Sequence, residues 1–129
     1  MRLGLTLLYV EDFPRMLSFY RDTLGLPLGD DDPGAGHEIG VDWVSFHTPG
    51  GGALELFDHA RFGRSLDLPY PRETANVVTF RVQSVDAVAE RLQAAGVELG
   101  AIRRAEWGAA AHFRDPEGNH LQIFESVAG

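Results

Sequence analysis

Histidine is the residue type in this chain that first suggests a functional site. There are five histidines and no cysteine, so a metal site would need imidazole and carboxylate ligands. Disulfides, thiolate zinc sites and cysteine nucleophiles are excluded. Three of the histidines, His47, His112 and His120, fall in apolar, strand-like runs. The same hairpins also carry an acid, Glu55, and an amide, Gln122. His37 and His59 lie in a Gly-rich loop and beside a linker, where we expect solvent-exposed side chains.

Other sequence motifs of enzymes are missing. The chain has no Gly-rich phosphate loop, no nucleophile elbow and no HExxH motif. Gly50, Gly51 and Gly52 follow a proline between two apolar runs and are interpreted as a hairpin turn. Arg103 and Arg104 are interpreted as solvated charges.

Composition limits the class of protein. The chain has 129 residues, of which 44% are apolar and 23% charged, which is typical of one globular domain. Its net charge of −8 argues against nucleic acid and anionic membranes as partners. No apolar run is long enough to span a bilayer, and the N-terminus lacks the features of a secretory signal. Together with the absence of cysteine, these features favour a cytoplasmic protein.

The elements that would position these side chains occur twice. Residues 46–57 align with residues 113–124 at a constant offset of 67, and residues 7–20 align with residues 79–92 at an offset of 72. Two matches in the same order predict two related modules, about residues 1–58 and 75–129. Residues 58–74 are expected to be a linker within a single domain that spans residues 1–129.

Each module has the same predicted order of strand, helix and three strands. First strands are expected over residues 5–10 and 76–82, followed by helices capped by Asp12 and Ser84 and ended by Gly25 and Gly96. Short strands are then expected at residues 25–28 and 96–99. The hairpins are expected at residues 41–57 and 108–125, and residues 29–36 are expected to form a loop.

This arrangement resembles the vicinal oxygen chelate superfamily, which includes glyoxalase I, bleomycin-resistance proteins, fosfomycin-resistance enzymes and extradiol dioxygenases. The resemblance covers essentially the whole chain and rests on YVED (residues 9–12), SFYRDTLGL (residues 18–26), WG (residues 107–108) and FRDPEGN (residues 113–119). It implies an α+β fold in which two βαβββ modules form a curled, cup-like mixed sheet with the helices on the outside, usually in paired chains. It also implies a divalent metal in the cup of the family's enzymes.

The family's metal-ligand positions fall here on the first and last strand of each module. Carried over residue by residue, they are Leu5, Glu55, Val77 and Gln122. Leucine and valine cannot coordinate a metal, and an amide oxygen is a weak ligand. We therefore expect no metal site and no cofactor. A relocated site built from His47, Glu55 and His112 is the alternative.

Strand alternation predicts which side chains line the cup if these positions point inward. We expect a largely apolar, aromatic pocket with a few polar groups, as small-molecule sites usually have. The ligand-binding candidates are Tyr9, Trp43, His47, Glu55, Phe57, Arg81, Trp107, His112, His120 and Gln122. Glu55 is the one carboxylate at a ligand position, so it is the candidate catalytic residue or the anchor for a cationic group. A salt bridge from Glu55 to Arg81 is the structural alternative.

The resemblance favours a metal-free binding protein of the bleomycin-resistance type, which sequesters a cationic or aromatic ligand without chemistry and confers antibiotic resistance. One alternative is an enzyme, either a glyoxalase-like lyase or isomerase or a dioxygenase, with a divalent metal at a nonstandard site. Another is an enzyme that uses Glu55 as a base without a metal. The expected partners are a small molecule and a second copy of the chain, because an open sheet leaves apolar surface and edges for a symmetric partner to cover.

Overall fold

The computed structural model describes residues 1, 5–31, 36–60 and 77–127. The chain divides into two compact units, residues 1–70 and 71–129. The predicted linker, residues 58–74, lies outside the described residues beyond its first three positions. Within the described residues, no helix has the length and apolar character needed to cross a bilayer.

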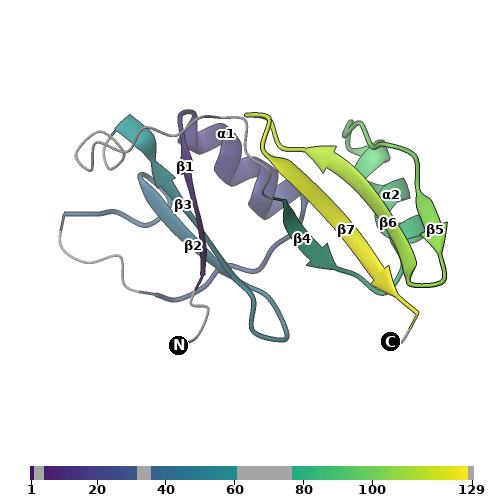
Figure 1. Ribbon diagram of the computed structural model, residues 1–129. Helices are drawn as coiled ribbons and strands as arrows, with labels where there is room; N and C mark the ends of the chain where they lie inside the picture. Colours follow the sequence, from purple (N-terminus) through teal and green to yellow (C-terminus); the bar gives the residue numbers. More distant parts are fainter. Residues whose placement is uncertain (2–4, 32–35, 61–76, 128–129) are drawn as a thin grey trace. The chain divides into compact units, whose positions relative to one another are not determined.

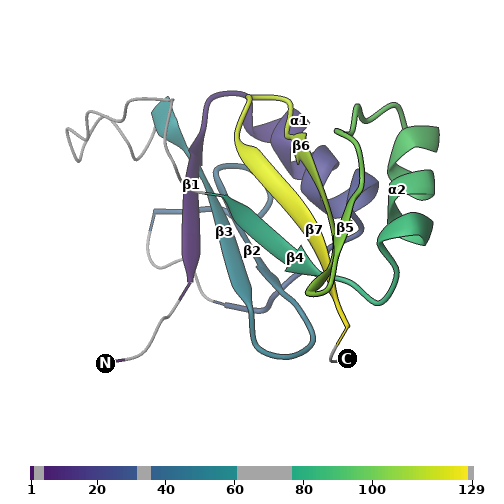
Figure 2. The same ribbon diagram turned by 45° about the vertical axis from the view of Figure 1, so that its right-hand side comes forward.

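The first unit is a three-stranded sheet with one helical segment. Its elements are β1 (Thr6–Val10), α1 (Phe13–Ser18), the π-helix η1 (Phe19–Thr23), β2 (Trp43–His47) and β3 (Ala53–Asp58). Strand β3 lies between β1, to which it is parallel, and β2, to which it is antiparallel; the sheet is seen in Figure 1, and Figure 2 shows β3 between the other two strands.

The second unit repeats this plan and adds one strand. Its elements are β4 (Val78–Arg81), α2 (Val85–Ala94), β5 (Arg103–Ala105), β6 (Gly108–Arg114) and β7 (His120–Ser126). The strand order is β4-β7-β6-β5, with β4 parallel to β7 and the other pairs antiparallel. Helix α2 packs on β6 and β7, and Figure 2 shows it along one face of this sheet.

The predicted helix starts are confirmed. Asp12 accepts a hydrogen bond from the Arg15 backbone N–H at 3.2 Å, and Ser84 accepts one from the Ala87 N–H at 3.1 Å. These side chains satisfy N–H groups that have no partner inside the first turn of a helix. Gly96 then follows α2 with a positive φ of 89°, which a residue without Cβ adopts without strain.

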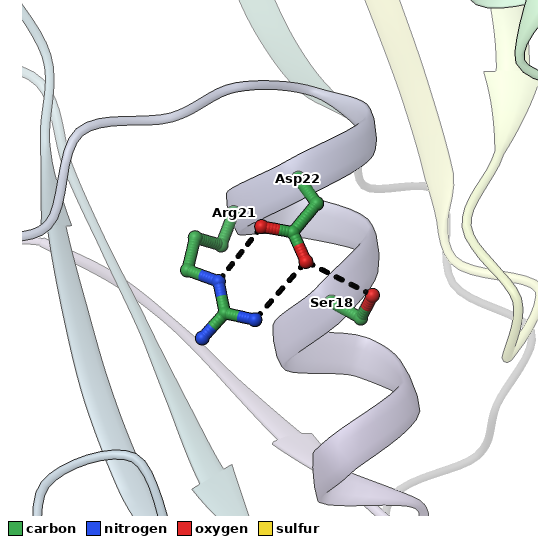
Figure 3. A network of polar contacts seen from close by, with 3 residues as sticks. All are labelled: Ser18, Arg21 and Asp22. Atoms are coloured by element: carbon green, nitrogen blue, oxygen red, sulfur yellow. Dashed lines mark hydrogen bonds and ion pairs between the residues drawn. The ribbon is translucent and has the colours of Figure 1, made fainter.

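The first helix differs from the prediction in its second half. The α-helical turns end at Ser18, and a π-helical segment follows, in which the Leu24 N–H donates to the Phe19 carbonyl at 2.9 Å. On its exposed side, Asp22 accepts from Ser18 Oγ at 3.2 Å and from Arg21 Nε at 2.8 Å (Figure 3). The wider turn lets Phe19 and Tyr20 both be buried, which periodicity alone does not reveal.

The expected short strands after the helices are also corrected. Residues 25–28 and 96–99 each make only one isolated bridge, Leu28 with Phe46 and Leu99 with Phe113. In the second unit the regular strand is β5, which pairs with the start of β6. Its last residue, Ala105, pairs with Gly108. A Cβ at Gly108 would overlap the Glu125 carbonyl, so this position requires glycine.

The core of each unit lies between its sheet and its helix. Val44, Phe46, Leu54 and Leu56 are buried on the side of the first sheet where the Tyr20 ring meets the Phe46 ring at 6.3 Å. Ala111, Phe113, Leu121 and Ile123 are buried on the α2 side of the second sheet. The mixed α+β class predicted from the repeat is therefore confirmed: each unit is a mixed sheet with a helix on one face.

Candidate functional site

The open face of the first sheet is the face opposite its core. The register pairs Leu7 with Glu55 and Tyr9 with Phe57, and it pairs Ser45 and Trp43 with the same two residues from the other side. Directly paired residues point to the same face of a sheet, so these side chains share one surface. The predicted site residues Tyr9, Trp43, His47, Glu55 and Phe57 thus lie together.

Aromatic rings form the apolar part of this face. The Phe57 ring lies 5.9 Å from Tyr9 and 6.3 Å from Trp43. His59, which we expected at the surface, is half-buried with its ring edge-on to Tyr9 at 6.4 Å. Rings at these separations gain from stacking and edge contacts. Trp43 is buried, at 2% exposure, whereas Tyr9 and Phe57 are half-buried, so the last two rings form the accessible aromatic surface beside a carboxylate.

That carboxylate is Glu55, which is half-buried. Burial raises the pKa of Glu55 above its ordinary value of 4.5, and the nearby Asp31 carboxylate raises it further. His47 and a hydrogen bond from Trp43 oppose this increase in pKa. Glu55 is therefore an acid whose charge is incompletely compensated by its own unit, which suits a group that binds a cation or moves a proton.

His47 lies at the edge of this face and contacts a loop. Its Nε2 is 2.5 Å from Asp31 Oδ2, and this contact raises the pKa of His47 and lowers the pKa of Asp31. Residues 27–29 run along β2, with the Gly29 N–H donating to the Ser45 carbonyl at 2.8 Å. A Cβ at Gly29 would overlap the His47 ring and lie 2.6 Å from Ser45 Oγ. Glycine at this position leaves room for the imidazole.

The open face of the second sheet carries the other five predicted residues. The register places Arg81 beside Phe124 on this face, together with His112, His120 and Gln122. The Arg81 guanidinium lies over the Phe124 ring, 5.8 Å from its centre. Trp107 stacks on the same ring at 5.9 Å with an interplanar angle of 23°. Phe124 therefore brings a cation and a second aromatic ring together.

Polar side chains on this face contact one another. Gln122 Nε2 donates to Thr79 Oγ1 at 3.0 Å, and Arg103 Nη2 lies 2.7 Å from His112 Nε2. Because a guanidinium only donates, the His112 nitrogen accepts. The interpretation of Arg103 and Arg104 as simply solvated is thus wrong: both are exposed, but Arg103 contacts His112 and Arg104 pairs with Asp86.

The family's metal positions do not fit a metal ion. Leu5 and Val77 offer no donor atom and stay 49% and 41% exposed. The Gln122 amide is engaged with Thr79, which leaves Glu55 as the one carboxylate at these four positions. Within the described parts of the chain, no cluster of three His, Asp or Glu side chains could hold a metal ion. His47 and Glu55 are on one sheet and His112 is on the other.

Three residues of these faces were not predicted from the sequence: Asp31, His59 and Arg103. Asp31 lies in a loop without periodicity, sixteen positions before the histidine that it contacts. Arg103 was missed because the strand that carries it was expected at residues 96–99. His37 also differs from expectation, because it is half-buried with Nδ1 4.0 Å from Asp42 Oδ2.

Comparison with known proteins identifies the family. The chain is 29% identical to the uncharacterized protein YraH of Bacillus subtilis (strain 168) in an alignment of 128 positions that covers 93% of this chain and 94% of that one. Its structure is similar to that of TnmS3, an antibiotic binding protein from Streptomyces sp. CB03234, with a TM-score of 0.75, 26% identity and coverage of 98% and 97%.

A lactoylglutathione lyase from Agrobacterium tumefaciens is also similar, with a TM-score of 0.68, 27% identity and coverage of 96% of this chain and 92% of that one. A family model matches residues 2–123, almost the whole chain, in agreement with the repeat and the two mixed sheets. The chain belongs to the Glyoxalase/Bleomycin resistance protein/Dioxygenase superfamily.

Proposed function

We propose that the protein binds and sequesters a small aromatic molecule with a positively charged group, without a metal ion and without changing it chemically. The observation that carries this proposal is the first sheet's open face, where the aromatic cluster of Tyr9, Trp43 and Phe57 adjoins Glu55. We also propose that it acts in the cytoplasm as a homodimer.

Two features support binding over metal-assisted catalysis. The four ligand positions of the family's enzymes hold one good ligand, Glu55. The similar antibiotic binding protein shows that this fold serves a relative that binds a drug. An acid of raised pKa beside aromatic rings favours a cationic ring system, because the ligand then compensates the charge that the protein compensates only in part.

The two tryptophans provide the binding assay, because each sheet has one in or beside its strands: Trp43 and Trp107. In a Trp107→Phe background, 1-naphthylmethylammonium should quench Trp43, and Glu55→Gln should weaken its binding by about 1 to 3 kcal/mol, the range for a lost charge-assisted hydrogen bond. Glu90→Gln makes the same charge change on the exposed side of α2 and should leave affinity unchanged. Equal effects of both variants would contradict a role for Glu55.

Metal independence is tested separately. A metal that binds only the folded state stabilises it by RT ln(1 + [L]/Kd), so removing it lowers the melting temperature. We expect a chelator to leave the melting temperature unchanged. A tightly bound stoichiometric divalent ion in the purified protein would contradict the proposal.

A second candidate function is proton transfer by Glu55. The raised pKa of Glu55 favours it, since a general base works best when its pKa approaches the working pH. The similar lactoylglutathione lyase suggests the substrate to try. Turnover of lactoylglutathione by the wild type, and its loss in Glu55→Gln, would show that the protein is an enzyme and would contradict the proposal that it only sequesters a ligand.

The proposed dimer is supported by apolar side chains that the first unit leaves open. Leu28, Ile39 and Val41 are each more than half exposed. A symmetric partner that covers them would remove apolar surface from water. Sedimentation at micromolar concentration should give a species of twice 14.1 kDa, and a species of 14.1 kDa would contradict the dimer.

A further inference from the structure

The second sheet carries positive charge in a chain that is strongly acidic. The chain has 19 acidic residues against 11 basic ones, yet the four strands of this sheet contain four arginines and one carboxylate. That carboxylate, Glu125, points to the helix side, where it accepts a hydrogen bond from the Val85 N–H at 2.8 Å. The open face therefore has no acid within its strands.

Three arginines share this open face. The register pairs Arg81 with Phe124, Arg103 with Ala110 and Arg114 with His120. All three side chains are exposed, and none forms an ion pair with a carboxylate of the described residues. By contrast, Arg104 on the other face pairs with Asp86, and Arg21 on η1 pairs with Asp22 (Figure 3).

An acid outside the four strands also fails to neutralise the face. Glu98 lies in the segment that bridges to β6 through Leu99 and Phe113, and by alternation it would lie beside Arg114. It is exposed and makes no ion pair with a described residue. The positive charge of Arg81, Arg103 and Arg114 is thus available to a ligand.

Aromatic surface adjoins these guanidinium groups. Trp107 stacks on Phe124, and Arg81 lies over the same ring. His112 and His120 add ring nitrogens on neighbouring strands. A guanidinium fork matches the two oxygens of a carboxylate, sulfonate or phosphate, while the rings offer contact area to a flat molecule.

We propose that the open face of the second sheet binds the anionic group of an aromatic small molecule, with Arg81 and Arg103 as its charge partners. This assignment rests on the proposed function, because it names the chemistry that the binding protein recognises on its second sheet. It is independent of Glu55, which lies on the first sheet and takes a cationic group.

The experiment uses two naphthalene probes of opposite charge. In a Trp43→Phe background, Trp107 reports on the second sheet, and we expect naphthalene-1-sulfonate to quench it at lower concentration than 1-naphthylmethylammonium does. Arg103→Gln and Arg81→Gln should each weaken naphthalene-1-sulfonate binding about tenfold, as expected for a lost charge-assisted contact at an exposed site. Both changes are at exposed positions, and circular dichroism will check the fold.

Arg104→Gln is the matched control. It removes the same charge from the next residue of β5, but from the opposite face, so the affinity for naphthalene-1-sulfonate should not change. Equal losses in Arg103→Gln and Arg104→Gln would overturn the assignment, because net charge alone would then govern binding.

Other outcomes separate this inference from the proposed function. If 1-naphthylmethylammonium binds in a Glu55-dependent way and naphthalene-1-sulfonate does not bind, the anion assignment fails and the proposed function stands. If neither probe binds, both fail. If Arg103→Gln halves the sedimenting mass and leaves probe affinity unchanged, a second copy of the chain covers this face, and the assignment is overturned.

Discussion

The two sheets of this protein share one backbone plan and differ on one face. Leu7 pairs with Glu55 across β1 and β3, and Thr79 pairs with Gln122 in the same register across β4 and β7. On the helix sides, leucine is buried at the equivalent positions 54 and 121. On the open sides, Tyr9 corresponds to Arg81, His47 to Arg114 and Glu55 to Gln122, and the aromatic pair Phe57 and Phe124 is retained.

This difference shows which part of the repeat the fold constrains. A side chain between sheet and helix must fill a given volume, so apolar residues persist there. An accessible side chain on the open face is limited by its ligand and by solvent. The same backbone therefore presents an acid with aromatic rings on one sheet and arginines with aromatic rings on the other.

The largest effect should come from the helix side of each sheet, where the two units have the same buried residue type. Leu54 is 5% exposed and Leu121 is 0% exposed. Leu54→Ala and Leu121→Ala should each lower the free energy of unfolding by about 3 kcal/mol, within the range for buried leucines. Urea denaturation measures both losses. A loss below about 1 kcal/mol for one variant would break the equivalence of the two cores.

The two hairpin turns should respond differently. Asp115 is 4% exposed, and it accepts bonds from the Glu117 N–H at 3.0 Å and from the Asn119 N–H at 2.9 Å. At the equivalent position, Thr48 donates one exposed bond to the Gly52 carbonyl. Asp115→Ala should therefore cost about 2 kcal/mol and Thr48→Ala less than 1 kcal/mol. Equal losses in thermal denaturation would contradict this contrast between the turns.

Glu55→Gln makes the first sheet resemble the second and should slightly stabilise the free protein. The pKa of Glu55 is raised in the folded state, so its ionisation opposes folding as pH rises above 4.5. We expect a gain of about 0.5 kcal/mol at pH 7, reduced by solvent screening, that disappears below pH 4.5. Denaturation at both pH values measures it, and a loss of stability at pH 7 would show that a cation already pairs with Glu55.

The smallest effect concerns His47, which corresponds to Arg114 on the second sheet. Asp31 raises the pKa of His47 above 6.5, so the contribution of the pair is complete below pH 6.5 and is lost as pH rises through the raised pKa. It is also lost in acid, as pH falls through the lowered pKa of Asp31.

An NMR titration of the His47 ring measures this shift. Asp31→Asn should return the His47 pKa toward 6.5, whereas Asp30→Asn should lower the pKa less, because Asp30 acts only through its charge. An unchanged pKa in Asp31→Asn would show that the loop does not hold this contact in solution. Both side chains of the pair are exposed, so we expect little change in stability.

Much of the fold could be predicted from local signals. The caps Asp12 and Ser84 and the two hairpins occur where expected, because their signals lie within a few residues of the structure they produce. The π-helix after Ser18 and the strand β5 were not predicted. The first depends on burying two adjacent rings, and the second depends on pairing with β6.

The sequence by itself determined the repeat, the family and the side chains that share each open face, because an alternating strand assigns its residues to faces without knowledge of the partner strand. Tertiary structure decided which of those side chains interact. Asp31 meets His47, Arg103 meets His112, and Arg81 lies over Phe124. Each of these contacts joins residues that are distant in sequence or on different strands, so only the closing of loops and strand pairs brings them together.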